Sequence, residues 1–212
     1  LSKVVITGCA AQVDTDSFAN LSGVDLVIAN SHKSKLFEII DGHLKQSKSE
    51  QKVFKSNIFL KREVDADQGI SADRARVFLK IQDGCNSFCT FCVIPFARGR
   101  SRSLSIAEIS SRIRSVHKAG VQEVVLTGVH IGDYEDHGMG LDKLVSGILA
   151  NTEIPRLRLS SLEPPELTED LLALFSNPRL CSHFHMSVQS ACTSVLKDMK
   201  RKYSAERSEE RR

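Results

Sequence analysis

The 212-residue sequence contains no apolar run that approaches the length of a membrane span. A transmembrane helix needs roughly 20 mostly apolar residues, so a membrane-spanning protein is excluded. The first residues also lack the charged leader, apolar stretch and cleavage site of a signal peptide. We therefore predict a cytoplasmic location and no membrane partner. An initiator methionine is missing as well, and because Leu1 opens directly into an apolar run, we expect an N-terminally truncated piece.

A strong net charge is also missing, since 29 Lys and Arg residues face 26 Asp and Glu residues. A balance of +3 is too small to indicate a nucleic-acid-binding protein by itself. The basic residues nevertheless gather in two places: Arg98, Arg100 and Arg102, and Lys197, Lys200, Arg201 and Lys202. Such clusters suit contacts with phosphates, and a solvated helix face with a charged tail is the alternative interpretation.

The six cysteines do not have the density of a secreted disulfide scaffold, which is shorter and richer in cysteine. Three of them fall within eight residues and the others are scattered: Cys85, Cys89 and Cys92, against Cys9, Cys181 and Cys192. Close clustering of thiols in a chain without a leader indicates a metal site.

Apolar strands alternate with amphipathic helices along the chain, which predicts an α/β fold with parallel sheets. The first part should contain strands at 4–7 and 25–29, a helix at 34–44 and a weak strand at 53–60. Polar and acidic residues predict a linker over 46–74. We therefore expect the C-terminal part of a small α/β domain over 1–45 and a second domain over 75–212.

A regular series of strand–helix units begins near residue 77. Strands are predicted at 77–81, 123–127, 156–160 and 183–188, with helices after them from residues 106, 141, 168 and 193. Ser105 and Glu108 have the spacing of a capping box, Gly120 should end that helix, and Thr168 should cap a helix that runs to Phe175. Four units cannot close a barrel, which takes about 250 residues for eight units. An open or incomplete βα barrel is therefore expected.

The clustered cysteines have the spacing Cys-x3-Cys-x2-Cys and follow the predicted strand 77–81: Cys85, Cys89 and Cys92. A four-iron cluster usually takes four cysteines, so three thiolates leave one iron open to the amine and carboxylate of a small molecule such as S-adenosylmethionine (SAM). Zinc is the alternative, with His117 or His130 as a fourth ligand, but structural zinc usually uses paired Cys-x2-Cys halves. Phe88 and Phe91 supply the apolar surroundings that suit an iron–sulfur cluster.

This loop resembles the signature of the radical SAM superfamily, and longer segments resemble its methylthiotransferases. The segments are 80–86 with 92–99, 123–130, 158–163, and 185–190 with 195–203. The resemblance covers nearly the whole chain in order. It is closest to the branch that modifies threonylcarbamoyladenosine in tRNA, because of the Thr127-Gly128-x-His130 form and the Cys-Thr-Phe-Cys ending of the loop.

The resemblance implies a transferase that cleaves SAM reductively to a 5′-deoxyadenosyl radical, which activates C2 of N6-threonylcarbamoyladenosine next to the anticodon. It implies a [4Fe-4S] cluster on the three cysteines of the loop, a second SAM as methyl donor and a second, auxiliary [4Fe-4S] cluster through which sulfur arrives. Cys9, in the segment 7–12, resembles the third cysteine ligand of that auxiliary cluster. The expected partners are the tRNA substrate and a reductant such as flavodoxin or ferredoxin, with a monomeric protein.

Polar residues at the ends of the predicted strands are candidates for SAM contacts, because ligands of parallel sheets bind at the carboxyl ends of strands. They are Gly128, Ser160, Ser161, Glu163 and Gln189, the last followed by Ser190. A role as simple turn formers is the alternative. The candidates for RNA contact are the arginines after the cysteine loop, Arg98, Arg100 and Arg102, and Arg98 is also a candidate for the SAM carboxylate.

Parts of the family pattern have no counterpart in this sequence: the first two auxiliary cysteines, two of six βα units, and the small C-terminal RNA-binding domain. Ala191 also stands where the family usually has glycine. We therefore expect a fragment that does not complete sulfur insertion by itself. The alternatives are a methylthiotransferase that acts on isopentenyladenosine in tRNA or on a ribosomal protein, and an inactive fragment that binds an iron–sulfur cluster.

Overall fold

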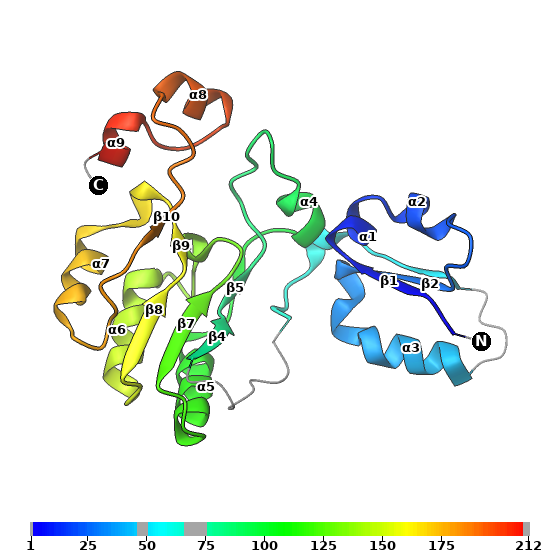
Figure 1. The fold of residues 1–212 in the computed structure, drawn as a ribbon, viewed down its shortest axis with the longest axis horizontal. Helices are drawn as coiled ribbons and strands as arrows, with labels where there is room; N and C mark the ends of the chain where they lie inside the picture. Colours follow the sequence, from blue (N-terminus) through cyan, green and yellow to red (C-terminus); the bar gives the residue numbers. More distant parts are fainter. Residues whose placement is uncertain (1, 46–50, 66–75, 210–212) are drawn as a thin grey trace. The chain divides into compact units, whose positions relative to one another are not determined.

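The computed structural model describes residues 2–45, 51–65 and 76–209. The ends of the predicted linker, 46–50 and 66–74, therefore lie outside the described residues. The chain divides into two compact units, which are considered separately: unit 1 is Leu1–Asp65 with Cys92–Arg100, and unit 2 is Ala66–Phe91 with Ser101–Arg212. Each unit combines helices with parallel strands (Figure 1), so the predicted α/β class is confirmed.

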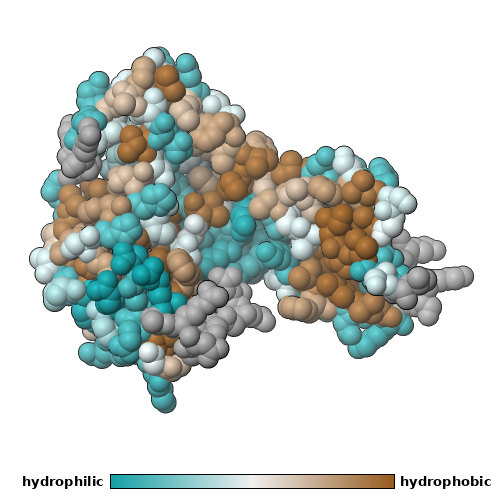
Figure 2. Space-filling view, in the orientation of Figure 1, coloured by the Kyte–Doolittle hydropathy of each residue, from teal (hydrophilic) through white to brown (hydrophobic). Residues whose placement is uncertain are grey.

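Unit 1 is built on a parallel sheet in the order β1-β2-β3. Its strands are β1 (Val5–Gly8), β2 (Leu26–Ala29) and β3 (Val53–Phe54), and its α-helices are α1 (Cys9–Val13), α2 (Thr15–Ala19), α3 (Leu36–Lys45) and α4 (Ile94–Arg98). The central strand β2 is buried along its whole length, as its apolar sequence predicts. Figure 2 shows a broad hydrophobic area on the visible face of this unit, and its exposed apolar residues include Phe37, Leu44 and Leu60.

Two elements of unit 1 differ from the prediction. The helix expected over 34–44 starts at Leu36, because the preceding segment Asn30–Lys35 winds as a 3₁₀ helix. The weak strand expected over 53–60 ends at Phe54, and Ile58–Leu60 is a 3₁₀ helix. The side chain of Asn57 accepts a hydrogen bond from the Phe59 N–H, and such local bonding favours a turn over continued strand pairing.

Unit 2 contains a parallel sheet in the order β4-β7-β8, a short parallel pair β9-β10 and a small antiparallel pair β5-β6. The strands are β4 (Arg76–Lys80), β5 (Gln82–Asp83), β6 (Arg102–Ser103), β7 (Glu123–Thr127), β8 (Arg156–Leu159), β9 (Ser161–Leu162) and β10 (His185–Met186). The α-helices are α5 (Ile106–Lys118), α6 (Leu141–Asn151), α7 (Glu169–Ala173), α8 (Thr193–Asp198) and α9 (Ala205–Glu209). Among the described residues these strands close no barrel, which agrees with the predicted incomplete barrel.

The helix starts of unit 2 follow the predicted caps. Ser105 accepts a hydrogen bond from the Glu108 N–H at the start of α5, and Thr168 accepts one from the Leu171 N–H at the start of α7. The carboxylate of Glu108 pairs with Arg112. Gly120 has a φ of +98° just after α5, a conformation that glycine adopts without strain. The helix α7 stops at Ala173, earlier than the predicted Phe175, because its last turn tightens into the 3₁₀ helix Leu174–Ser176.

The core of unit 2 lies between β4, β7 and β8 and the crossover helices, of which α5 and α6 contact each other. Its fully buried side chains include Ile109, Ile113, Leu126, Leu144, Ile148 and Leu157. The last predicted strand, 183–188, shortens to β10, because Tyr203 takes the carbonyl groups of Ser187 and Val188 as hydrogen-bond acceptors. Within residues 2–45, 51–65 and 76–209, no helix has the length and apolar character needed to cross a membrane.

Candidate functional site

The cysteine loop leaves the sheet of unit 2 directly after β5, and its base is held by ionic contacts. Asp83 pairs with Lys80 at 2.8 Å and with Arg102 at 3.2 Å, and its other oxygen accepts from the Gly84 N–H. Arg102, proposed as an RNA contact, is therefore a largely buried side chain that stabilises the loop. The loop passes from unit 2 to unit 1 between Phe91 and Cys92.

The three cysteines of the loop are buried to different degrees. Cys85 is half-buried and Cys89 is buried, both in unit 2, and Cys92 is half-buried in unit 1. Phe88 lies between the first two with a φ of +47°, in the left-handed region that few residues other than glycine adopt. This strained residue turns the chain tightly between two thiols, as a short ligand loop requires.

The second half of the loop is tied to the end of α8. The backbone N–H of Thr90 donates to the Met199 carbonyl at 3.3 Å, and the Thr90 hydroxyl donates to the Asp198 carbonyl at 3.1 Å. The guanidinium of Arg201 lies 5.6 Å from the centre of the Phe91 ring, within the range of a cation–π contact. Residues at and just after the end of α8 therefore fix the position of the loop.

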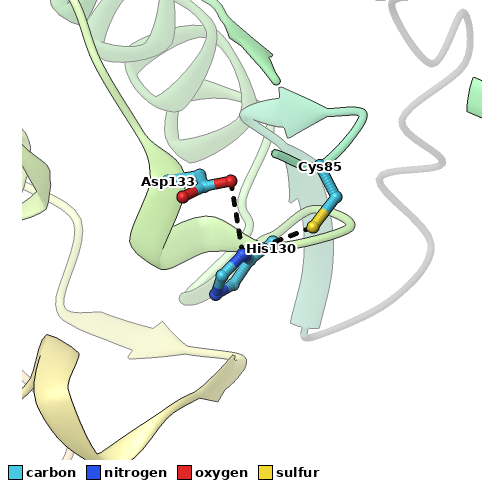
Figure 3. Close-up of side chains that lie close together, drawn as sticks. All are labelled: Cys85, His130 and Asp133. Atoms are coloured by element: carbon cyan, nitrogen blue, oxygen red, sulfur yellow. Dashed lines mark hydrogen bonds and ion pairs between the residues drawn. The ribbon is translucent and has the colours of Figure 1, made fainter. Parts of the chain in front are cut away.

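His130 is the centre of a polar network at the carboxyl end of β7 (Figure 3). Its Nδ1 atom lies 3.6 Å from the Sγ atom of Cys85 and 3.3 Å from an oxygen of Asp133. Its Nε2 atom forms an ion pair with Glu166, although the N–H does not point at that carboxylate as a hydrogen bond would. The backbone N–H of His130 donates to the Gln82 side chain at 2.9 Å, and the ring is 12% exposed.

The charges of this network are coupled. Burial opposes the charged form of His130, but its contacts with Asp133, Cys85 and Glu166 raise its pKa to about 12. Burial also raises the pKa of Cys85, yet hydrogen bonds from His130 and Ser87 bring it below its ordinary value. The pKa of Asp133 falls in the same way, because the contact with His130 outweighs burial. The site thus favours a thiolate, which is the form of cysteine that binds metals.

A cavity of about 160 Å³ opens beside this network. It is lined by Ser87, His130, Gly132, Asp133, Glu163, Pro165, Glu166, Lys200, Arg201 and Lys202. Arg201 pairs with Glu163, its side chain is 8% exposed, and its Nε atom has no hydrogen-bond partner in the described part of the chain. A Cβ atom on Gly132 would collide with the Glu166 carboxylate, so a glycine is needed where that carboxylate reaches the His130 ring.

The residues proposed for SAM contacts differ in whether they line this cavity. Glu163 lines it, whereas the other candidates are not among its described lining residues. Gly128 packs against Gln82, whose two oxygens lie 2.9 Å from where a Cβ would stand. Ser161 bonds the His185 ring at 2.9 Å, and the Ser160 N–H extends the sheet by donating to Leu126. Gln189 is exposed and has a φ of +65°, and the half-buried Ser190 follows it.

The remaining predicted site residues lie in unit 1. Cys9 begins α1, and the side-chain amide of Asn30 lies 3.5 Å from its Sγ atom. The same amide nitrogen donates to the Ala97 carbonyl at 2.9 Å, which fixes its direction. Arg98 ends α4 as a half-buried side chain, and Arg100 is exposed.

The sequence does not predict the roles of Asp133 and Glu166 in the polar network, and it places Arg201 in a basic cluster without its pairing with Glu163. The sequence places His130 in the family motif 127–130 and offers it as a possible zinc ligand, without a link to the carboxylates around it. One feature of the sequence could have indicated this network. His130 and Asp133 are three residues apart, as are Glu163 and Glu166, and this spacing brings two polar side chains close together on one tight helical turn. Cys85, His130 and Asp133 also offer ligand atoms within 4.8 Å of one another, as do His130, Glu163 and Glu166.

Comparison with known families identifies the class of protein. A family model described as the Radical SAM superfamily matches residues 79–211, which is more than half of the chain. The chain therefore belongs to the radical SAM superfamily.

Curated relatives narrow the resemblance. The chain is 41% identical to the threonylcarbamoyladenosine tRNA methylthiotransferase MtaB of Aquifex aeolicus over 98% of this chain and 51% of the relative. It is 33% identical to MtaB of Bacillus subtilis over 96% of this chain and 46% of the relative. The tRNA-2-methylthio-N(6)-dimethylallyladenosine synthase of Desulfotalea psychrophila is 31% identical over 96% of this chain and 48% of the relative. The chain thus spans about half the length of the curated relatives it matches.

A solved structure shares the fold. The radical SAM methyltransferase TsrM from Kitasatospora setae, solved with tryptophan and a SAM analogue, matches with a TM-score of 0.70 and 14% identity. The match covers 98% of this chain and 46% of that chain.

Proposed function

We propose that this chain is part of a tRNA methylthiotransferase that adds a methylthio group to C2 of N6-threonylcarbamoyladenosine next to the anticodon. The observation that carries the proposal is the Cys-x3-Cys-x2-Cys spacing of Cys85, Cys89 and Cys92 in a loop that begins just after the parallel strand β4 and the short strand β5. Ligands of parallel sheets bind at this carboxyl end of the strands. The similarity to relatives with this activity supports the choice of substrate.

The donor set fits the [4Fe-4S] cluster that the superfamily uses. Cys85, Cys89 and Cys92 are the proposed ligands, and the lowered pKa of Cys85 favours the thiolate that binds iron. When bound, the cluster supplies an electron for the reductive cleavage of SAM. Glu163 and Gln189 are proposed to contact SAM together with Gly128, Ser160 and Ser161.

We further propose a role for each part of the chain. Residues 1–45 belong to the methylthiotransferase N-terminal domain, in which Cys9 is one ligand of an auxiliary cluster, and residues 75–212 belong to the radical SAM core. Arg98 and Arg100 are the remaining candidates for contact with tRNA phosphates. The proposed setting is a monomer in the cytoplasm that receives electrons from a flavodoxin or ferredoxin.

The cluster is tested by anaerobic reconstitution of the chain with iron and sulfide. We expect a broad visible absorbance and about four irons with four sulfides per chain, as a cubane cluster requires. Bound zinc without acid-labile sulfide would contradict the proposal and would favour a site on Cys85, His130 and Asp133.

The substrate is tested in a strain that lacks its own threonylcarbamoyladenosine methylthiotransferase and expresses the complete reading frame that contains this chain. We expect mass spectrometry of tRNA nucleosides to show the 2-methylthio form of threonylcarbamoyladenosine. A methylthio group on isopentenyladenosine or on a ribosomal protein would support one of the alternatives. An unmodified tRNA pool would indicate an inactive product.

A further inference from the structure

The sulfur of Cys85 receives two hydrogen-bond contacts within unit 2. The backbone N–H of Ser87 lies 3.4 Å from the sulfur, and Nδ1 of His130 lies 3.6 Å from it. Both distances are within the range for sulfur acceptors, which are larger and softer than oxygen. The contact from Ser87 comes from the backbone, so a side-chain substitution does not remove it. The contact from His130 comes from a side chain and depends on the residue at that position.

The surroundings of His130 fix both the orientation of its ring and the direction of hydrogen-bond donation. An oxygen of Asp133 lies beside Nδ1, and the Glu166 carboxylate lies beside Nε2. The Asp133 carboxylate accepts hydrogen bonds and does not donate them, so the adjacent Nδ1 carries the hydrogen and is a donor toward the sulfur rather than an acceptor.

The supports of the ring are themselves anchored. Glu166 accepts a hydrogen bond of 2.7 Å from the Glu163 N–H, and Gly132 leaves the space that its carboxylate occupies. Asp133 accepts a hydrogen bond of 3.1 Å from the Asn86 N–H, one residue after the thiol. The ring is thus held against the cysteine loop from both sides, and at 12% exposure its contact with the sulfur is shielded from water.

A hydrogen bond donated to a cysteine ligand draws negative charge away from the sulfur. The reduced cluster carries one more negative charge than the oxidised cluster, so it gains more from the same bond. Hydrogen bonds to the sulfurs are for this reason one of the determinants of iron–sulfur reduction potentials.

We propose that His130 is a positioning residue that raises the reduction potential of the iron–sulfur cluster by donating a hydrogen bond to the Cys85 ligand. Asp133 and Glu166 act through it by holding its ring. The inference rests on the cluster proposed for Cys85, Cys89 and Cys92, and it adds a group outside the ligands that controls how easily that cluster is reduced.

The test is a redox titration of the reconstituted chain without SAM, followed by electron paramagnetic resonance of the reduced cluster. His130→Ala removes the donor, and we expect the ratio of reduced to oxidised cluster at a fixed potential to fall about tenfold, a shift of about 59 mV for a one-electron couple. His130→Gln carries an amide N–H that reaches the sulfur, so it should recover part of the shift. His183→Ala is the control, because this histidine is exposed in the same unit.

The outcomes separate the inference from the proposed function. Full iron content in His130→Ala with a midpoint no different from that of His183→Ala would overturn the inference alone. A wild-type chain that takes up no iron and sulfide would overturn the proposed function and the inference with it.

A second measurement covers the case in which His130→Ala fails to hold the cluster. Wild-type chain labelled with ¹⁵N-histidine should then show a weak nitrogen coupling to the reduced cluster in pulsed electron paramagnetic resonance. The absence of that coupling would overturn the inference.

Discussion

The carboxylate of Glu123 accepts a hydrogen bond of 2.8 Å from Nε of Arg158, across the neighbouring strands β7 and β8. Arg156 donates to the other oxygen at 2.9 Å, and Arg76 of β4 lies 2.9 Å away on the opposite side. One carboxylate, 9% exposed, therefore joins all the strands of the central sheet of unit 2.

Replacement of Glu123 by Gln should lower the free energy of unfolding by about 2 kcal/mol, because hydrogen bonds to a charged group are lost and the guanidinium groups repel one another. Urea denaturation followed by circular dichroism measures this loss. Glu108→Gln is the control, since its pair with Arg112 is on an exposed helix surface and should contribute less than about 0.5 kcal/mol. Equal losses in the two variants would contradict the role of Glu123.

The contribution of Glu123 should also depend on pH. Burial raises the pKa of this carboxyl group, but the hydrogen bonds from Arg158 and Arg156 and the charge of Arg76 bring it below its ordinary value of about 4.3. The group in the folded protein thus binds its proton less readily than in the unfolded chain. Its stabilisation is complete above about pH 4.3 and disappears as the pH falls through the lowered pKa. The difference in unfolding free energy between wild type and Glu123→Gln should therefore narrow steadily below about pH 4.

Gly99→Ala should destabilise unit 1 much more than Gly23→Ala. Both glycines have positive φ angles, +83° and +81°, so both substitutions introduce backbone strain of about 1–2 kcal/mol. A Cβ atom at residue 99 would in addition collide with the backbone carbonyl of the buried Ile58, whereas residue 23 has nothing within 4 Å. We expect a total loss of about 3 kcal/mol or more for Gly99→Ala in urea denaturation. Similar losses in the two variants would show that the collision is relieved.

Serine substitutions in the cysteine loop should abolish cluster assembly. Removal of one ligand from Cys85, Cys89 or Cys92 leaves a cubane with too few thiolates, so iron and labile sulfide should fall from about four per chain to near zero. Cys192→Ser is the matched control, because this thiol is exposed and its sulfur lies 3.2 Å from the hydroxyl oxygen of Ser194. Iron retained by all of the loop variants would exclude the proposed ligands.

Ser105→Ala tests the start of α5. The lost bond to the Glu108 N–H should reduce the free energy of unfolding by about 1 kcal/mol. Ser111→Ala, at an exposed position inside the same helix, should leave the free energy of unfolding unchanged or slightly increase it. Thermal unfolding of the two variants side by side measures the difference.

The elements with a clear apolar period could be predicted from the sequence. The strand Glu123–Thr127 is predicted to the residue, and the caps Ser105 and Thr168 mark their helices, because these signals depend on neighbours within one turn or one strand. The antiparallel pairing of β5 with β6 could not be predicted, because each strand has only two residues, both polar, and shows no alternation of apolar and polar side chains.

The candidate site could be predicted only in part. The spacing of the thiols pointed to a metal site because it is local. His130 follows β7 and contacts Glu166 after β9, and Arg201 follows α8 and pairs with Glu163 after β9. These segments are far apart in the sequence, and nothing within any of them indicates its partner. Arg102 shows the converse, because this member of the predicted phosphate-binding cluster of arginines points inward and pairs with Asp83.

The bond between Thr90 and Asp198 spans 108 residues, and this separation has a consequence for synthesis. A ribosome adds roughly 5–20 residues each second, so the segment that ties the cysteine loop emerges about 5–20 s after the loop itself. During that interval the thiols of the loop are made but not yet held by α8. Delivery of iron and sulfur is therefore best timed after α8 has been translated. Oxidising conditions during translation should reduce the yield of protein that can bind a cluster.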